Sequence, residues 1–319
     1  MSKLDSMSRR QFLGAFGAAT VAMAGLGLVG CGGNSAASDA AASDAAASDA
    51  AASVSGIVNC SGATSFQTLV ESAAHKFEDK YPDVTIAITG GGSGQGLSDV
   101  KDGKAQIGRS DVFAEEKIDA ADAAKLEDHT VCVVGMGPVV NSNVDVDDLT
   151  TEQLKGIFTG AITDWSEVGG TAGKIQVIER KAGSGTRATF EAAVLAGDKA
   201  PESFAPVAEE DSSGTVVEKI QQTEGAISYL AFSYYDDTKF RALKVDGVEP
   251  CAENVCSGEF NIWAYEHMYS AKDADEATKA FLDFMMSDEV QGSLVEEEGF
   301  IPVSDMKVAK DAKGNVSSK

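Results

Sequence analysis

The sequence predicts an α/β fold in which strands run through polar turns into helices. The apolar run Ile57–Cys60 leads through Gly62–Ser65 into apolar positions that recur on one helical face. The alternating run Val84–Ile88 leads into the glycine-rich turn Gly90–Gly96, and Arg180–Thr186 opens a third helical pattern. In an open α/β sheet such turns gather at the carboxyl ends of the strands, where ligands bind.

All three turns have the composition of an anion-binding site. Each places Gly and Ser or Thr at the start of a helix, where backbone N–H groups and the helix dipole favour a negative charge. Arg180 adds a fixed positive charge to the third turn. A single turn of this kind is equally consistent with an ordinary loop and helix cap. Three turns of one design predict a site for a small anion.

The charge of the chain limits the other partners that it could bind. There are 26 basic and 50 acidic residues, which give a formal net charge of −24. This excess of acid argues against nucleic acid, which needs a basic face, and against docking on anionic lipid by charge. It does not exclude a small anion, because an enclosed site acts through local dipoles.

The amino terminus has the pattern of an exported lipoprotein. Ser8–Leu13 matches a twin-arginine export signal, and the apolar stretch Ala15–Gly30 is too short to favour a permanent span. Leu28–Cys31 resembles a bacterial lipobox. We therefore predict a signal peptide over residues 1–30 and a lipid on Cys31, on the extracytoplasmic face of the cell membrane. The alternative is a simple anchor with a coincidental cysteine.

Residues 31–55 are expected to form a tether behind the lipid-bearing cysteine. The segment is rich in Ala, Ser and Asp and has no large apolar residue before Val54, so it cannot form a core. The remaining length is enough for two packed lobes.

The other cysteines leave the disulfide pattern open. An exported protein can oxidise its thiols, and four cysteines allow three pairings. Cys251 and Cys256 are near enough in sequence for a local bridge, whereas Cys60 and Cys132 are distant from them. The three histidines are scattered, so we expect no transition-metal site, and no cofactor motif is present.

Beyond these local patterns, the chain from about Ile57 to Val308 resembles the phosphate-binding proteins of bacterial phosphate ABC importers. The landmarks of the family occur in the family's order. They are Gly62–Ser65, Gly90–Gly94, Ile107–Asp111, Leu149–Leu154, Ile157–Gly160, Asp164–Trp165, Arg180 with Gly183–Thr186, Gly225–Tyr229 and Gly299–Pro302.

The resemblance implies a two-lobed periplasmic-binding-protein-like α/β fold with two hinge crossings. Val131–Val140 and Phe260–Met268 are the candidate crossings. The first lobe would be discontinuous and comprise residues 56–137 and 262–319. The second lobe would comprise residues 138–261.

The resemblance also implies a phosphate site with donors from both lobes and one acceptor. Asp111 would accept a hydrogen bond from a protonated phosphate oxygen, and Arg180 would form a charge-assisted pair with the anion. The other implied contacts are hydroxyl and backbone donors: Thr64, Ser65, Ser93, Ser184, Gly185 and Thr186.

Two positions depart from the family pattern. Arg109 stands two residues before Asp111, where the family usually has a small residue. It could pair with Asp111, add charge to the site or point outward. Ala182 stands where relatives often carry an acid near the binding arginine. Both positions affect the charge balance of the predicted site.

The function implied by the resemblance is extracytoplasmic binding of inorganic phosphate and its delivery to the permease and ATPase subunits of a phosphate ABC transporter. Alternatives are a binding protein for another oxyanion such as sulfate or molybdate, a surface interaction protein, or a phosphate-ester hydrolase. The hydrolase is disfavoured because Ser93 and Ser184 lack a G-x-S-x-G context and no histidine lies near a serine in a motif. We predict that the protein is not an enzyme.

Overall fold

The computed structural model describes residues 54–319. The predicted signal peptide, Cys31 and almost all of the predicted tether lie outside the described residues. Within residues 54–319, no helix combines the length and the apolar character needed to cross a membrane.

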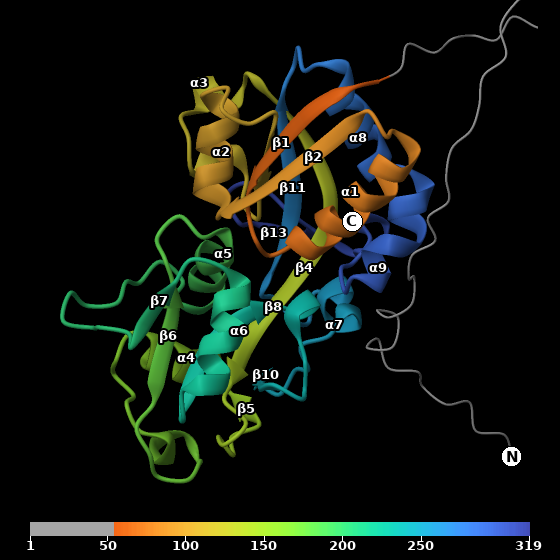
Figure 1. Cartoon of the computed structure of the whole chain (residues 1–319). Helices are drawn as coiled ribbons and strands as arrows, with labels where there is room; N and C mark the ends of the chain where they lie inside the picture. Colours follow the sequence, from red (N-terminus) through yellow and green to blue (C-terminus); the bar gives the residue numbers. More distant parts are fainter. Residues whose placement is uncertain (1–53) are drawn as a thin grey trace, which may run out of the picture. The chain divides into compact units, whose positions relative to one another are not determined.

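One nine-stranded sheet runs through the described part of the chain (Figure 1). Its order is β2-β1-β3-β11-β4-β8-β6-β7, and β9 pairs with β4 beside this path. The strands are β1 Gly56–Gly62, β2 Val84–Gly91, β3 Ile107–Ser110, β4 Leu126–Val140, β6 Gln176–Arg180, β7 Ala208–Glu210, β8 Ala226–Ala231, β9 Arg241–Ala242 and β11 Trp263–Ala271.

The sheet consists of two parallel halves joined by antiparallel strands. Strands β1, β2 and β3 are mutually parallel, as are β6, β7 and β8. The 15-residue strand β4 pairs with β11 along Leu126–Gly135 and with β8 along Met136–Val140. A single strand thus continues from one half into the other, and the fold is a two-lobed periplasmic-binding-protein fold.

Both segments expected to cross between the lobes contribute to this junction. Val131–Val140 forms the second part of β4, and the segment Phe260–Met268 contains the first residues of β11. Near the crossing, Val133 also pairs with Ile301 in an isolated bridge, with backbone hydrogen bonds of 2.8 and 2.9 Å. The chain segment at Ile301 is therefore hydrogen-bonded to β4 close to the junction of the lobes.

Helices cover both faces of the first half-sheet. Adjacent residues of a strand point to opposite faces. Met268 of β11 accordingly packs in the core below α1 and α8, whereas Tyr269 packs with α2 and α3. The bounds are α1 Gln67–Lys80, α2 Ser93–Lys101, α3 Ala120–Ala123, α8 Glu276–Met285 and α9 Val295–Glu297.

The helix α8, near the carboxyl terminus, packs against α1 of the first lobe. Its apolar side chains are buried: Phe281, Leu282, Phe284 and Met285. The Phe77 ring of α1 lies 5.2 Å from the Phe281 ring, in an edge-on arrangement that aromatic pairs favour.

In the second lobe, helices α4 Thr151–Phe158, α5 Gly185–Val194 and α6 Ser213–Gln222 flank the sheet. Thr150 and Gln153 form the reciprocal hydrogen bonds of a capping box, so α4 begins at a position that the sequence specifies. Phe158, Phe190 and Tyr229 form the aromatic centre of this lobe, and the Phe190 and Tyr229 rings stack at 4.2 Å.

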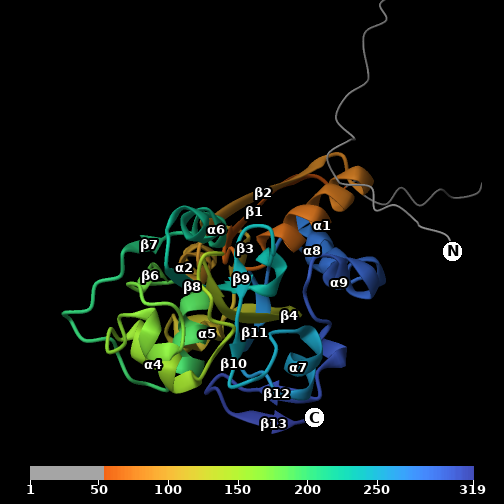
Figure 2. The ribbon, with the colours of Figure 1, turned by 90° about the horizontal axis from the view of Figure 1, so that it is seen from below.

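Shorter elements complete the chain. In Figure 2 the β12–β13 hairpin lies beside α7, and the Lys307 N–H donates to the Cys256 carbonyl across this contact. The elements are α7 Ala252–Ser257, β5 Asp148–Leu149, β10 Lys244–Val245, β12 Val308–Lys310, β13 Val316–Ser318, the 3₁₀ turns η1 Ala114–Glu116, η2 Trp165–Val168, η3 Phe232–Tyr234 and η5 Val303–Asp305, and the π-helical turn η4 Val290–Leu294.

The four cysteines of the described chain are free thiols. Cys251 is the N-cap of α7 and Cys256 lies within that helix. Five residues of α-helix rise about 7.5 Å, which exceeds the separation of Cα atoms that a disulfide tolerates. Helix α7 therefore prevents the local bridge that the short sequence separation allowed.

Candidate functional site

Four helix starts meet where the two half-sheets face each other. Helices α1 and α2 follow β1 and β2 of the first lobe, while α5 and α6 follow β6 and β7 of the second. The carboxyl ends of parallel strands lie at one edge of a sheet, so each half-sheet brings its two turns together. The hydroxyl side chains nearest the helix starts are almost fully buried although they are polar: Thr64, Ser65, Ser93, Ser184, Thr186 and Ser213.

Asp111, directly after β3, is the centre of this cluster. Its side chain is 2% exposed and its carboxylate accepts hydrogen bonds from three hydroxyls. Ser65 and Ser93 donate to Oδ1 at 2.7 and 3.2 Å, and Thr186 of the second lobe donates to Oδ2 at 2.8 Å. The Asp111 N–H in turn donates to Ser93 Oγ at 3.0 Å. One carboxylate therefore collects donors from both lobes.

Arg180, the last residue of β6, supplies the positive charge of the site. It is 1% exposed, and burial lowers its pKa from the usual value, an effect that the charge of Asp111 opposes. A guanidinium nevertheless remains charged in proteins. Its Nη2 donates to Thr64 Oγ1 at 3.3 Å across the lobes, and its Nη1 donates to Ser213 Oγ at 3.2 Å.

Close backbone contacts join the lobes beside these side chains. The Gly94 N–H of α2 donates to the Gly183 carbonyl at 3.0 Å. A Cβ on Gly185 would lie 2.1 Å from Ser93 Oγ and 2.8 Å from Asp111 Cβ. Only glycine fits at this position while the two lobes are in contact.

The helix starts differ in how their free N–H groups are satisfied. Helix α1 begins after Phe66 and α2 after Gly92, and neither has a side-chain cap. Helix α5 is capped by Ser184, whose Oγ accepts from the Arg187 N–H at 3.2 Å. The Ser184 hydroxyl is therefore engaged within its own helix.

The structure brings together seven of the eight predicted site residues through side-chain contacts or close packing. They are Thr64, Ser65, Ser93, Asp111, Arg180, Gly185 and Thr186. Ser184 lies beside them, 6% exposed, with its hydroxyl in the helix cap.

Sequence reasoning missed Ser213, the first residue of α6. It is fully buried, its N–H donates to Thr64 Oγ1 at 3.2 Å and its Oγ accepts from Arg180. A signal was present, because Ser212 and Thr215 form a capping pair at a Ser- and Gly-containing helix start. The turn precedes α6 in the same way as the three turns recognised in the sequence.

Arg109 points inward, so the outward orientation that the sequence left open is wrong. The side chain is fully buried, its Nη2 donates to the Thr89 carbonyl at 2.6 Å and its guanidinium lies 6.0 Å from the Phe66 ring centre. Within residues 54–319, its Nε and Nη1 have no hydrogen-bond partner. Arg109 therefore adds positive charge behind the site without a hydrogen bond to Asp111.

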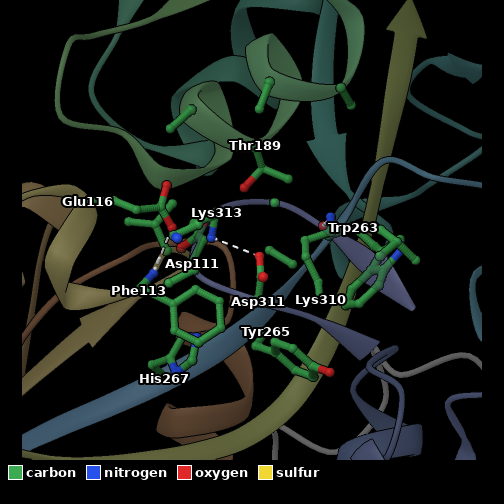
Figure 3. Close-up of a pocket in the computed structure, with 18 of the residues that line it drawn as sticks. Asp111, Phe113, Glu116, Thr189, Trp263, Tyr265, His267, Lys310, Asp311 and Lys313 are labelled. Carbon is green, nitrogen blue, oxygen red and sulfur yellow. Dashed lines mark hydrogen bonds between the residues drawn. The ribbon is translucent and has the colours of Figure 1, made fainter. Parts of the chain in front are cut away.

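Asp111 also lines a cavity of about 440 Å³ (Figure 3). The rings of Phe113, Trp263 and Tyr265 line it, together with Lys310 from the carboxyl-terminal segment. The Lys310 ammonium lies 4.2 Å from the centre of the Trp263 ring, and burial lowers its pKa to about 8. In the described range, no group of three or more His, Cys, Asp or Glu side chains is placed to hold a metal ion.

A buried guanidinium, converging hydroxyls and one carboxylate suit a small oxyanion that still carries a proton. The donors come from two lobes that share a hinge strand, which defines a ligand-binding protein of the periplasmic-binding-protein class. Comparison with family models agrees, because residues 45–289 match the model of the PBP superfamily domain.

Individual relatives specify the family. The phosphate-binding protein PstS of Bacillus subtilis (strain 168) is 49% identical over 263 residues, which cover 82% of this chain and 86% of that protein. A structure from Clostridium perfringens, described as a phosphate ABC transporter substrate-binding protein with bound phosphate, is 35% identical with a TM-score of 0.71, and the match covers 78% of this chain and 100% of that one. An ABC-type phosphate transport receptor from Vibrio cholerae is 29% identical with a TM-score of 0.61, over 76% and 99% of the two chains. The chain belongs to the PstS family of phosphate-binding proteins.

Proposed function

We propose that this protein binds inorganic phosphate between its two lobes and delivers it to the permease and ATPase subunits of a phosphate ABC transporter. The observation that carries the proposal is the meeting of Asp111 and Arg180, from different lobes, in one buried cluster. The proposed contacts are Thr64, Ser65, Ser93, Asp111, Arg180, Ser184, Gly185 and Thr186, to which we add Ser213.

Arg180 and the hydroxyls account for the affinity of the proposed site. A dehydrated anion needs a donor for each oxygen, since a buried acceptor left unpaired costs about 1–3 kcal/mol. The hydroxyls that now donate to Asp111 can rotate to donate to an anion. The uncapped starts of α1 and α2 offer further N–H donors.

Asp111 accounts for the choice of anion. Phosphate near neutral pH keeps at least one proton and can donate to the carboxylate, which can only accept. Sulfate has no proton, so it would bring only lone pairs and a like charge to Asp111. Selectivity for phosphate of about a thousandfold, or about 4 kcal/mol, is the expected result.

Calorimetry with phosphate and sulfate tests the proposal. Wild type should bind phosphate at least about a thousandfold more tightly than sulfate, and Asp111→Asn should narrow this ratio because an amide can also donate. Asp237→Asn is the matched control, because Asp237 is exposed in the second lobe. Sulfate binding within about tenfold of phosphate in wild type would refute the role of Asp111.

The setting of the proposed function is the outer face of the cell membrane. We infer that Cys31 carries the lipid, that residues 31–55 are the tether, and that the lobes comprise residues 56–137 with 262–319 and residues 138–261. The lipobox pattern supports the anchor. Cys31→Ala should leave the protein unprocessed or release it from the membrane fraction, and unchanged membrane retention of fully processed protein would contradict the anchor. We infer no catalytic activity for the site.

A further inference from the structure

A second carboxyl group lies directly behind Asp111. Glu266 is in β11, and the antiparallel register pairs its neighbour His267 with Ser110 of β3. One residue further along, the same register puts Glu266 opposite Asp111. On its other side Glu266 pairs with Cys132 of β4. The side chain is fully buried, in the part of the sheet that joins the lobes.

The two neighbouring carboxyl groups have opposite surroundings. Asp111 accepts three hydroxyl hydrogen bonds, whereas neither oxygen of Glu266 has a hydrogen-bond partner among the described residues. Burial raises the pKa of Glu266 well above its usual range, and the charge of Asp111 raises it further. Two adjacent buried carboxyl groups do not both ionise, and the charge is most stable where donors surround it. The single negative charge therefore belongs on Asp111 and the proton on Glu266.

The other groups around Glu266 do not alter this assignment. The Cys60 thiol of β1 has a pKa raised to about 11 by burial, and Cys132 of β4 is also raised by burial. Tyr234 of η3 has a pKa raised to about 12, mainly by burial. All three stay neutral near pH 7. Ser65, which lies between α1 and β1, is an uncharged donor to Asp111.

Two neighbours favour an ionised Glu266: the Ser65 hydroxyl, which donates to Asp111, and Arg109, whose positive charge lowers the pKa of the Glu266 carboxyl. Its guanidinium, however, is directed to the Thr89 carbonyl and the Phe66 ring. No hydrogen bond joins Arg109 to Glu266 in the described chain. Burial and the adjacent Asp111 charge are the larger influences on Glu266.

We propose that Glu266 is a positioning residue for Asp111: it stays protonated and its O–H donates to the Asp111 carboxylate from the side away from the ligand. The inference rests on the proposed function. When Ser65, Ser93 and Thr186 turn their hydroxyls toward phosphate, Asp111 loses three donors, and the Glu266 proton remains to hold the carboxylate in place. It also limits the negative charge that faces the anion to that of Asp111.

Substitution of Glu266 by Gln distinguishes a neutral acid from an ionised one. Glu266→Gln keeps a neutral hydrogen-bond donor, so phosphate affinity at pH 7 should stay within about threefold of wild type. If Glu266 were ionised, Gln would remove a negative charge beside the anion, and phosphate should then bind more tightly to the variant than to wild type. Tightening of about tenfold or more in the Gln variant overturns the proposal.

Removal of the donor tests the positioning role. Glu266→Met should weaken phosphate binding about tenfold or more, and Gln should restore it. Above the pH at which Glu266 loses its proton, wild type should bind phosphate more weakly than the Gln variant. Only wild type then has a second negative charge, on Glu266, beside that of Asp111. Equal phosphate binding in wild type, Gln and Met variants across that pH range would contradict the role. Glu253→Gln, at an exposed position in α7, is the matched control.

Infrared difference spectroscopy without phosphate tests protonation independently of the proposed function. The purified wild-type protein at pH 7 should show the carbonyl stretch of a protonated carboxylic acid that Glu266→Gln lacks and Glu253→Gln retains. Absence of this band in wild type overturns the inference even if phosphate binds. Presence of the band in a protein that does not bind phosphate would leave Glu266 protonated and refute the proposed function instead.

Discussion

The two lobes equip the same site in different ways. In the first lobe, α1 and α2 start without side-chain caps, and the charged group that contacts the second lobe is the acceptor Asp111. In the second lobe, Ser184 and Ser212 cap α5 and α6, and the charged group is the donor Arg180. The first lobe therefore presents helix-start N–H groups that no side chain caps, whereas the second lobe presents a guanidinium and hydroxyls. An anion with one proton needs both sets, and neither lobe supplies them alone.

Loss of the second lobe's charge should have the largest effect. Arg180→Gln removes the guanidinium, so its positive charge no longer offsets the negative charge of Asp111 beside the anion. Two charge-assisted hydrogen bonds, at about 1.5–3 kcal/mol each, correspond to a loss of about a hundredfold or more in phosphate affinity. Calorimetry measures the effect, with Arg241→Gln in β9 as the control for loss of an arginine. A loss below about tenfold would mean that the first lobe holds the anion by itself.

A substitution between the lobes should have the next largest effect. In Gly185→Ala the new methyl group would meet Ser93 Oγ at 2.1 Å, so the lobes cannot make their present contact. Overpacking of this kind costs about 1–3 kcal/mol and should weaken phosphate binding about tenfold or more. Small-angle scattering measures the radius of gyration with and without phosphate. The decrease on adding phosphate should be larger in wild type than in the Gly185→Ala variant.

Gly214→Ala is the matched control for this substitution. Its Cβ would only come within 3.8 Å of Ser212 Oγ, which is an ordinary contact at the start of α6. Phosphate affinity and scattering should then resemble wild type. If Gly185→Ala behaves in the same way, phosphate binding does not require the contact between Gly185 and the first lobe.

The smallest expected effect concerns the caps of the second lobe. Ser184→Ala and Ser212→Ala should each lower the free energy of unfolding by about 1 kcal/mol, the usual value of an N-cap. If the Ser184 hydroxyl remains in its cap, phosphate affinity should change only a few-fold in both variants. Urea unfolding and calorimetry measure the two quantities. A loss of affinity of about a hundredfold in Ser184→Ala alone would assign its hydroxyl to the anion.

Local patterns in the sequence predicted the strand–turn–helix units, because these depend on residues within a few positions of each other. The same patterns, together with the family resemblance, predicted the site residues that now surround Asp111. The glycine at position 185 was implied as a contact, but its need for space beside Ser93 follows only from the approach of the second lobe.

By itself the sequence predicted an α/β chain with anion-binding turns and an excess of acidic residues, and the family resemblance implied that Asp111 and Arg180 share one site. Tertiary structure alone decided that Arg109 is buried, that Ser213 joins the cluster and that Glu266 lies behind Asp111. Glu266 is 155 positions after Asp111 in the chain, and only the pairing of β11 with β3 brings them together. Spacing along a sequence carries no information about such a pairing, since it depends on how the whole sheet is assembled.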